Sequence, residues 1–285
     1  MYTSDTLTHK NILITGGGSG LGLTMAQHFA RYGAQIAICG RTTSRLEQAV
    51  ETIKAEREGV NVQSYQCDVR DYHQVSSMFD QLQSDFGVIN GLVNNAAGNF
   101  LSASEDLTPG GFKAIIDIVL HGSFNCTHAF GNALIHQKKP GSILNIVTTY
   151  AEHTGCAFVL PSACAKSGVL SMTRSLAFEW ATYGIRLNAI APGPFPTEGA
   201  WTRLVPDPNM EKAFLNKIPM KRYGEPGELA NLAVFMLSDL ANYMTGECIS
   251  IDGGERLQAG QFNFIDSLME REQLKVVFQS MKPQK

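Results

Sequence analysis

The sequence of 285 residues is 44% hydrophobic and carries a formal net charge of −3. That size allows one sizeable core, and the charge gives no basic field of the kind that nucleic-acid binding requires. No apolar run is long enough to span a bilayer, and residues 1–11 lack the apolar core of a signal peptide. We therefore expect one domain over residues 1–285, with neither a nucleic-acid nor a membrane partner.

The cysteines and histidines suggest no metal chemistry. Six cysteines are scattered along the chain without a CxxC pair, which favours reduced thiols in a cytoplasmic protein over disulfides. The seven histidines form no zinc-like spacing with thiols or carboxylates. We expect no metal site and a cytoplasmic location.

Apolar runs rich in β-branched residues alternate with segments of helical periodicity along the chain. Strands are expected at residues 11–15, 35–39, 62–67, 91–94, 142–148, 185–191 and 248–251. Helices are expected at residues 20–32, 44–57, 75–86, 112–136, 161–183 and 228–240. Because the connections are of helix length, the predicted fold is α/β: a single-domain Rossmann fold whose doubly wound parallel sheet has about seven strands and helices on both faces.

A glycine-rich turn, TGGGSGLG at 15–22, follows the first predicted strand. A tight turn needs positive φ angles, and close approach of the backbone to a pyrophosphate needs positions without Cβ atoms. The start of the next helix adds free N–H groups for the anion. The placement between a strand and a helix favours a dinucleotide site over an ordinary glycine loop. The predicted cofactor-binding residues of this turn are Gly16, Gly17, Gly18, Ser19, Gly20 and Leu21.

The end of the second predicted strand bears on the choice of nucleotide. NAD-dependent enzymes usually place an acidic side chain there, to bind the ribose 2′-hydroxyl. This chain has Arg41 instead, a planar cation suited to a 2′-phosphate. The sequence therefore favours NADP(H), with a solvated helix-start arginine as the alternative. Asp68, which follows the third predicted strand, is expected to contact the adenine or to cap the next turn.

Two segments depart from the strand and helix alternation. Residues 192–220 contain six prolines, and a long irregular loop of this kind is commonly a functional lid. We expect it to be a lid over the substrate. Residues 255–285 are expected to form an appended arm. The sequence leaves open whether the arm covers a subunit interface or the substrate channel.

Several motifs resemble those of a known superfamily. TGGGSGLG at 15–22, NNAAG at 94–98 and Lys166, inside the helix after the fifth predicted strand, are similar to the short-chain dehydrogenase/reductase superfamily over nearly the whole chain. Most members carry a tyrosine four residues before this lysine. Here that position holds Ser162, a poorer proton donor than a phenol, so ordinary ketone reduction is not the first expectation.

A tyrosine does occur nearby, at Tyr150 in TTYAE, where the fifth predicted strand ends. Parallel sheets bind ligands at this edge. With this tyrosine, five further segments resemble the 2,4-dienoyl-CoA reductase family. They are NNAAGNF at 94–100, DIVLHGSF at 117–124, PSACAKSG at 161–168, APGPFPTEGAWTRL at 191–204 and RYGEPGELANLAVFMLSD at 222–239.

The resemblance implies which residues form the site. The implied catalytic residues are Tyr150, Lys166, Asn99 and Ser162. Lys166 would also bind the cofactor, and the nicotinamide would lie along Pro192, Gly193, Pro194 and Phe195. The implied substrate contacts, each of which could instead be an ordinary surface residue, are Arg41, Arg70, Phe100, Thr108 and Arg203.

The chain departs from the family pattern in two places. The interval from Tyr150 to Lys166, 166 − 150 = 16, is one residue longer than expected, with His153 or Thr154 as the insertion. Val119 stands where most superfamily members carry a helix asparagine. The absence of this helix asparagine fits the dienoyl-CoA reductases and leaves Asn99 as the asparagine of the active site.

The implied activity is NADPH-dependent reduction of 2,4-dienoyl-CoA to 3-enoyl-CoA in unsaturated fatty acid β-oxidation. Hydride transfer would produce a dienolate, with Tyr150 and Asn99 donating hydrogen bonds to the thioester oxygen. The resemblance also implies a homotetramer with an acyl-CoA substrate. Two alternatives stay open: another NADPH-dependent short-chain carbonyl or 3-oxoacyl reductase, and a non-catalytic nucleotide-sensing protein.

Overall fold

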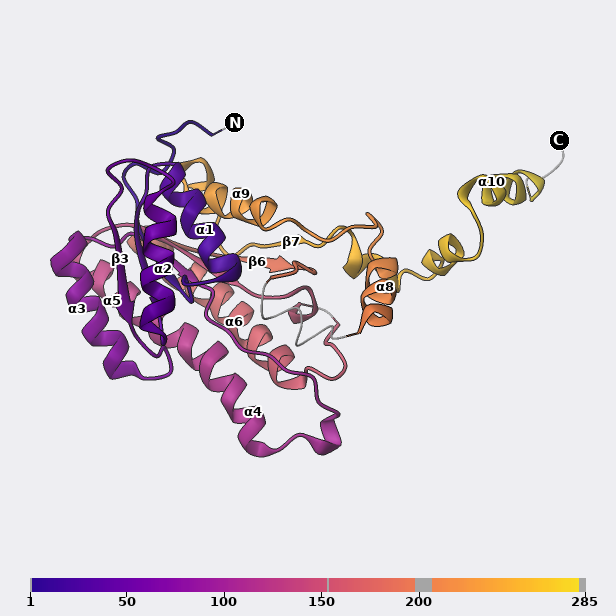
Figure 1. Ribbon diagram of the computed structural model, residues 1–285, viewed down its shortest axis with the longest axis horizontal. Helices are drawn as coiled ribbons and strands as arrows, with labels where there is room; N and C mark the ends of the chain where they lie inside the picture. The colour runs from indigo at the N-terminus through magenta and orange to yellow at the C-terminus, as the bar shows by residue number, and fades with distance from the viewer. Residues whose placement is uncertain (1, 153, 198–206, 282–285) are drawn as a thin grey trace.

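The computed structural model describes residues 2–152, 154–197 and 207–281, and within them one parallel sheet forms the centre (Figure 1). Its strands are β1 (Asn11–Thr15), β2 (Gln35–Gly40), β3 (Val62–Gln66), β4 (Gly91–Asn94), β5 (Gly141–Ile146), β6 (Ile185–Pro192) and β7 (Cys248–Ile251). They lie in the order β3-β2-β1-β4-β5-β6-β7, and each neighbouring pair is parallel. The order reverses between β1 and β4, where open α/β sheets bind ligands.

Helices cover both faces of the sheet. One face carries α1 (Gly20–Arg31), α2 (Thr43–Lys54) and α9 (Pro226–Leu237); the other carries α3 (Tyr72–Phe86), α5 (Gly122–Gln137) and α6 (Leu160–Glu179). Because successive strand side chains point to opposite faces, Ile12 and Ile14 enter the core beneath α1 while Leu13 enters the core beneath α3 and α5. The predicted doubly wound parallel sheet of about seven strands is confirmed.

The single helix predicted over residues 112–136 is wrong. The segment consists of α4 (Pro109–Ile115), a π-helical turn (Ile116–His121) and α5. It begins earlier than predicted because the Thr108 side chain accepts from Gly111 N and Pro109 occupies the first helical turn, both favourable at a helix start. The π turn adds a residue that a 3.6-residue period does not reveal, and such turns are frequent near functional sites.

The fifth strand ends at Ile146, two residues before the predicted end. A short 3₁₀ helix (Thr149–Ala151) follows it, and Tyr150 lies in this turn. Val147 still pairs with β6 through a hydrogen bond from its N–H to Ile190 O, at 2.8 Å. The apolar and β-branched run continues past the point where the chain turns, which explains the longer prediction.

Residues 192–220 are not irregular throughout, as the prolines suggested. The described part contains α8 (Pro208–Lys217). Asp207 caps it by accepting from Asn209 N at 2.6 Å and Met210 N at 3.4 Å, and Pro208 lies in its first turn. Asp followed by Pro is a helix-start signal, so this helix was legible in the sequence.

The C-terminal arm projects away from the sheet beyond α8 (Figure 1). It consists of two short 3₁₀ helices (Glu255–Ala259 and Asn263–Ser267) and α10 (Arg271–Ser280). Its large apolar side chains, such as Phe262, Phe264 and Leu268, are exposed.

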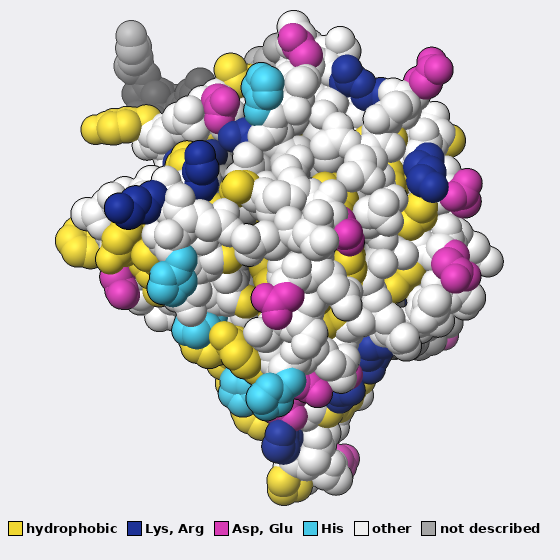
Figure 2. All heavy atoms as spheres, turned by 90° about the vertical axis from the view of Figure 1, so that its left-hand side faces the viewer, with side chains coloured by type: hydrophobic (Ala, Val, Ile, Leu, Met, Phe, Trp, Pro, Cys, Tyr) yellow, Lys and Arg dark blue, Asp and Glu magenta, His cyan; other side chains and the backbone are white. Residues whose placement is uncertain are grey.

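Acidic and basic side chains are interspersed on the molecular face that Figure 2 presents, in line with the small net charge. Among the described helices, none combines the length and apolar character that crossing a membrane demands. All six cysteines are free thiols.

Candidate active site

A cleft of about 1510 Å³ runs along the carboxyl edge of the sheet. Residues that follow β1 to β6 form its floor, and residues 156–159 and α8 contribute an outer wall. It brings together most of the residues that the sequence singled out. Those that line it are Gly16, Gly18, Ser19, Gly20, Leu21, Arg41, Asp68, Asn99, Tyr150, Ser162, Lys166, Pro192, Gly193, Pro194 and Phe195.

The glycine-rich turn has the geometry of a phosphate cradle. Gly16 and Gly20 have φ angles of 65° and 54°, which side chains with a Cβ rarely adopt. Asn95 holds the turn from the β4 side by donating from Nδ2 to Thr15 O at 3.0 Å and Gly16 O at 3.3 Å. Gly17 lies outside the cleft lining, since a Cβ on it would point at Ile38 Cγ2, 2.5 Å away.

The Tyr150 hydroxyl lies 3.0 Å from Ser162 Oγ, and either group can donate. Burial raises the pKa of the phenol, while hydrogen bonding to Ser162 acts in the opposite direction, as do Thr148 and Asn99 nearby. The contact between Thr148 and the phenol falls short of hydrogen-bond geometry, so buried Thr148 Oγ1 has no hydrogen-bond partner among the described residues. Since Thr148 also lines the cleft, a polar ligand group could satisfy it.

Lys166 lies on α6, one turn beyond Ser162, and its side chain is buried at the cleft floor. Nζ donates to Ile146 O, the last carbonyl of β5, at 2.5 Å. Burial lowers the pKa of this amine to about 8. An ammonium group has three donors, so the cation at the floor of the cleft has further hydrogen bonds to offer a ligand.

Val119 is fully buried in the π-helical turn. It packs in an apolar cluster with Val147 of the β5 end and with Ala165 and Val169 of α6. The place that holds an asparagine in most members of the superfamily is therefore apolar here. Asn99, whose Oδ1 accepts from Phe100 N at 2.9 Å, lines the cleft from the loop after β4.

The nucleotide end of the cleft carries Arg41 and Arg45 together with Asp68. Arg41 is exposed, and its guanidinium is thus available to an anion. Asp68 accepts from Arg70 Nε at 2.9 Å and Nη2 at 2.5 Å, and these bonds keep the pKa of its carboxyl low. Arg70 is thereby paired with Asp68.

Three of the predicted substrate contacts do not line the cleft: Arg70, Phe100 and Thr108. Thr108 instead caps α4. Arg203 lies outside the described residues. Sequence reasoning missed a set of residues at the substrate end, most of them apolar, although two members, Leu101 and Phe158, lie close in sequence to Asn99 and Ser162. The missed lining residues at this end are Leu101, Cys156, Ala157, Phe158, Val159, Met210, Phe214, Lys217 and Glu255.

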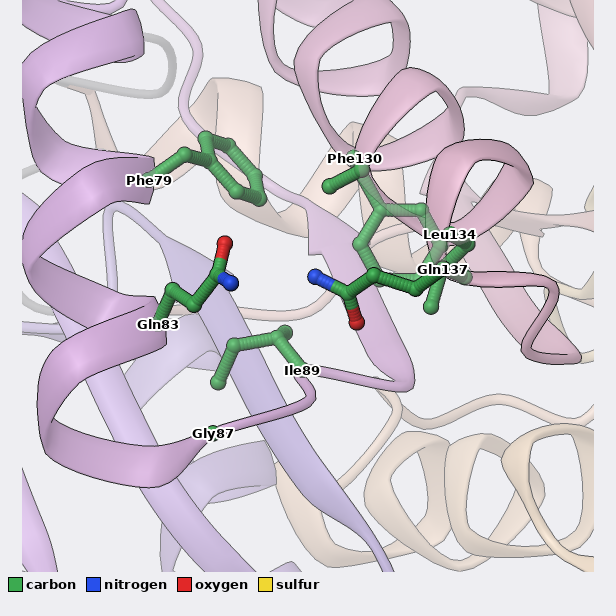
Figure 3. A pocket seen from close by; sticks show the side chains of 8 residues that line it. Phe79, Gln83, Gly87, Ile89, Phe130, Leu134 and Gln137 are labelled. Carbon is green, nitrogen blue, oxygen red and sulfur yellow. The ribbon is translucent and has the colours of Figure 1, made fainter.

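A second hollow lies between α3 and α5, where the side chains of Gln83 and Gln137 face each other (Figure 3). Its volume is about 10 Å³, room for about one water molecule. It adjoins Gly87 and Ile89, before β4 begins, and so lies at the edge opposite to the one that binds ligands. In the described part of the chain, no group of three or more histidine, cysteine or acidic side chains is arranged to hold a metal ion.

Comparison with known proteins shows the family of this chain. A family model described as Enoyl-(Acyl carrier protein) reductase matches residues 16–255. A solved short chain dehydrogenase from Bacillus anthracis is 42% identical and superposes with a TM-score of 0.80 over 88% of this chain and 98% of that one. The chain therefore belongs to the short-chain dehydrogenase/reductase family, whose members are oxidoreductases that use a nicotinamide cofactor.

Two curated relatives are more specific. A Bacillus subtilis protein named probable 2,4-dienoyl-CoA reductase (2E-enoyl-CoA-producing) is 45% identical over 89% of this chain and 99% of its own length. A Caenorhabditis elegans protein named probable 2,4-dienoyl-CoA reductase 3 (3E-enoyl-CoA-producing) is 43% identical over 88% of this chain and 81% of its own length. The resemblance seen in the sequence motifs is confirmed. The two names differ in the position of the product double bond.

Proposed function

We propose that this chain is an NADPH-dependent 2,4-dienoyl-CoA reductase that forms 3-enoyl-CoA. The observation that carries the proposal is the hydrogen bond of 3.0 Å between Tyr150 and Ser162 Oγ. It brings a phenol, from the loop after β5, beside the helix position where most members of the family carry their tyrosine. The names of the curated relatives support the same substrate class.

The residues of the cleft fit a nicotinamide dinucleotide. The turn with positive φ angles at Gly16 and Gly20, followed by the start of α1, offers backbone N–H groups to a pyrophosphate. Exposed Arg41 and neighbouring Arg45 suit a 2′-phosphate, which favours NADPH over NADH. When bound, the cofactor supplies a hydride, which in this reaction adds to C5 of the diene.

The chain's own residues act on the charge that this addition creates. As C5 gains the hydride, the π electrons shift so that double bonds form at C3–C4 and C1–C2, and the thioester oxygen becomes negative. Tyr150 and Asn99 donate hydrogen bonds to that oxygen, and one well-placed donor of this kind is worth about 3 kcal/mol. Lys166 binds the ribose hydroxyls of the cofactor, and its charge favours the negative oxygen. Ser162 orients the phenol.

Protonation then decides which product forms. A proton at C2 gives 3-enoyl-CoA, whereas a proton at C4 gives 2-enoyl-CoA. C2 is bonded directly to the thioester carbon, so a substrate held by its carbonyl at Tyr150 presents C2 to the hydroxyl groups gathered there. We therefore propose protonation at C2, with water as the proton source.

The test is turnover by the purified protein. NADPH oxidation is followed with 2,4-hexadienoyl-CoA and, separately, with acetoacetyl-CoA. In D₂O, NMR of the product should find deuterium at C2 and the double bond at C3–C4. Oxidation driven by acetoacetyl-CoA alone would assign a carbonyl reductase instead, and deuterium at C4 would assign the 2-enoyl product.

We also infer three features of the protein's setting. The described cysteines are free thiols, which suits a reducing, cytoplasmic compartment. By resemblance to the family, the assembly is a homotetramer. Residues 192–220, a long proline-rich connection of the kind that commonly forms a lid, act as a lid over the acyl-CoA. Light scattering of the purified protein tests the assembly.

A further inference from the structure

Phe158 has an unusual backbone conformation. Among the described residues other than glycine, three have positive φ angles: Lys138 (52°), Phe158 (64°) and Lys221 (54°). Lys138 ends α5 as its left-handed C-cap, an ordinary helix ending. Phe158 lies before α6 instead, two residues ahead of Leu160. A bulky residue in this region is strained, and such strain persists at ligand-binding positions when the surroundings enforce it.

The surroundings of Phe158 enforce the conformation through its backbone. Its carbonyl accepts a hydrogen bond from Ser102 N at 2.9 Å, which ties the loop before α6 to the loop after β4. The next residue, Val159, is buried. The aromatic residue itself keeps 60% of its surface exposed. Packing in the protein core therefore does not account for an aromatic side chain here.

Phe158 lines the cleft together with several apolar residues and with the charged side chains of Lys217 and Glu255. Leu101 flanks it across the Ser102 hydrogen bond, and Met210 and Phe214 of α8 line the same cleft. Phe158 and Ser162, the partner of Tyr150, are four residues apart. The exposed aromatic residue thus belongs to the substrate end of the cleft, away from the glycine-rich turn.

We propose that Phe158 is a specificity-determining residue: it forms an apolar wall that contacts the acyl chain beyond the conjugated diene and favours the longer acyl-CoA substrates. The inference rests on the proposed function for the identity of the ligand as an acyl-CoA. Each methylene that moves from water into apolar contact is worth roughly fourfold in affinity. An acyl chain too short to reach Phe158 gains no affinity from this contact.

The test measures acyl-CoA binding, because binding does not require turnover. Calorimetry with the protein saturated with NADPH compares hexanoyl-CoA with decanoyl-CoA, and the wild-type protein should bind the longer chain more tightly. In Phe158→Gly, affinity for decanoyl-CoA should fall by about tenfold, with affinity for hexanoyl-CoA within about twofold. Because glycine accepts a positive φ without strain, Tm should stay the same or rise.

Two variants separate the ring from the backbone. Asparagine tolerates the left-handed region but lacks an apolar ring, so Phe158→Asn should match Phe158→Gly. Phe158→Leu keeps an apolar side chain and should retain most of the chain-length preference. If only Phe158→Gly loses affinity for decanoyl-CoA, the loss comes from backbone flexibility, and the proposed role of the Phe158 ring is wrong.

Other results also overturn the inference. One is that the wild-type protein binds hexanoyl-CoA and decanoyl-CoA with equal affinity. The other is that Phe158→Gly lowers the affinity for both acyl-CoAs by the same factor. Turnover of 2,4-hexadienoyl-CoA is read separately. If the protein does not turn over this substrate but still binds the longer acyl-CoA more tightly, the proposed reaction is wrong and the role of Phe158 stands. If the protein binds neither acyl-CoA, the proposed reaction and the role of Phe158 are both wrong.

Discussion

The two halves of the cleft are built differently. The cofactor half consists of strand ends and a glycine-rich turn that Asn95 fixes by hydrogen bonds. The substrate half consists of loop residues around Leu101 and Phe158 and of α8. The first half serves every nicotinamide-dependent reaction of the fold, whereas the second must fit one substrate. Function that varies among relatives is commonly carried by loops on a rigid scaffold.

The largest effect on cofactor binding is expected from a substitution at Gly22, in the cofactor half. A Cβ at this position would lie 2.5 Å from Gly16 O, so Gly22→Ala must displace the phosphate-binding turn. Overpacking of this kind costs up to ~3 kcal/mol, and we expect NADPH affinity to fall about a hundredfold. The matched control is Gly110→Ala, where a Cβ meets nothing within 4 Å. Fluorescence titration with NADPH measures both; equal affinity in the two variants would contradict the account.

Lys166 lies at the floor of the cleft, where the cofactor half and the substrate half meet. We expect it to set the pH dependence of kcat/KM. Burial lowers its pKa to about 8, so the amine is charged below that pH and neutral above it. Only the charged form stabilises a negative oxygen, and kcat/KM, which reports free-enzyme pKa values, should fall about fivefold from pH 8 to pH 9. A kcat/KM that stays constant to pH 10 would exclude this role.

Unfolding does not account for such a loss. Between pH about 8 and the ordinary lysine value of 10.5, the unfolded chain binds a proton that the folded chain has released. The contribution of Lys166 to the free energy of unfolding therefore rises over this interval. Lys166→Met should abolish the alkaline decline in kcat/KM along with most of the activity.

Arg41 tests the nucleotide end of the cofactor half. A charged hydrogen bond to phosphate contributes about 1.5 kcal/mol or more, so Arg41→Ala should raise the dissociation constant for NADPH about tenfold and leave that for NADH unchanged. Arg45→Ala provides the comparison, since Arg45 lines the same end. If Arg45→Ala has the larger effect, the 2′-phosphate is bound there instead.

The smallest effect is expected from removing a hydrogen bond that holds the turn containing Tyr150 against α6. Ser167 Oγ donates to Ala151 O at 2.8 Å, and Arg174 pairs with Glu152, so α6 holds both residues that follow Tyr150. Ser167→Ala should lower kcat about threefold, the worth of a typical hydrogen bond, and lower Tm slightly, without changing NADPH affinity. Ser167→Thr keeps the hydroxyl and should restore kcat. An unchanged kcat in Ser167→Ala would show that this bond does not position the phenol.

The sequence predicted the cofactor half better than the substrate half, for physical reasons. The turn at 15–22 and the strands carry local signals: missing Cβ atoms, β-branched runs and regular spacing. The cleft position of Tyr150 followed from its place after the fifth predicted strand, at the edge where parallel sheets bind ligands, but its short 3₁₀ helix did not. The π turn at Ile116–His121 inserts a residue without interrupting the apolar pattern. The conformation of Phe158 depends on a hydrogen bond to Ser102, from a loop far away in the sequence.

The central claim is that the phenol of Tyr150 stabilises the thioester enolate, and Tyr150→Phe tests it most directly. The variant keeps the ring and removes only the hydroxyl that meets Ser162. Single-turnover reduction of 2,4-hexadienoyl-CoA should slow by about 10²- to 10³-fold, while the dissociation constants of NADPH and substrate stay within about twofold. A rate within about threefold of the wild-type rate would contradict the account and leave the group that stabilises the enolate oxygen unassigned.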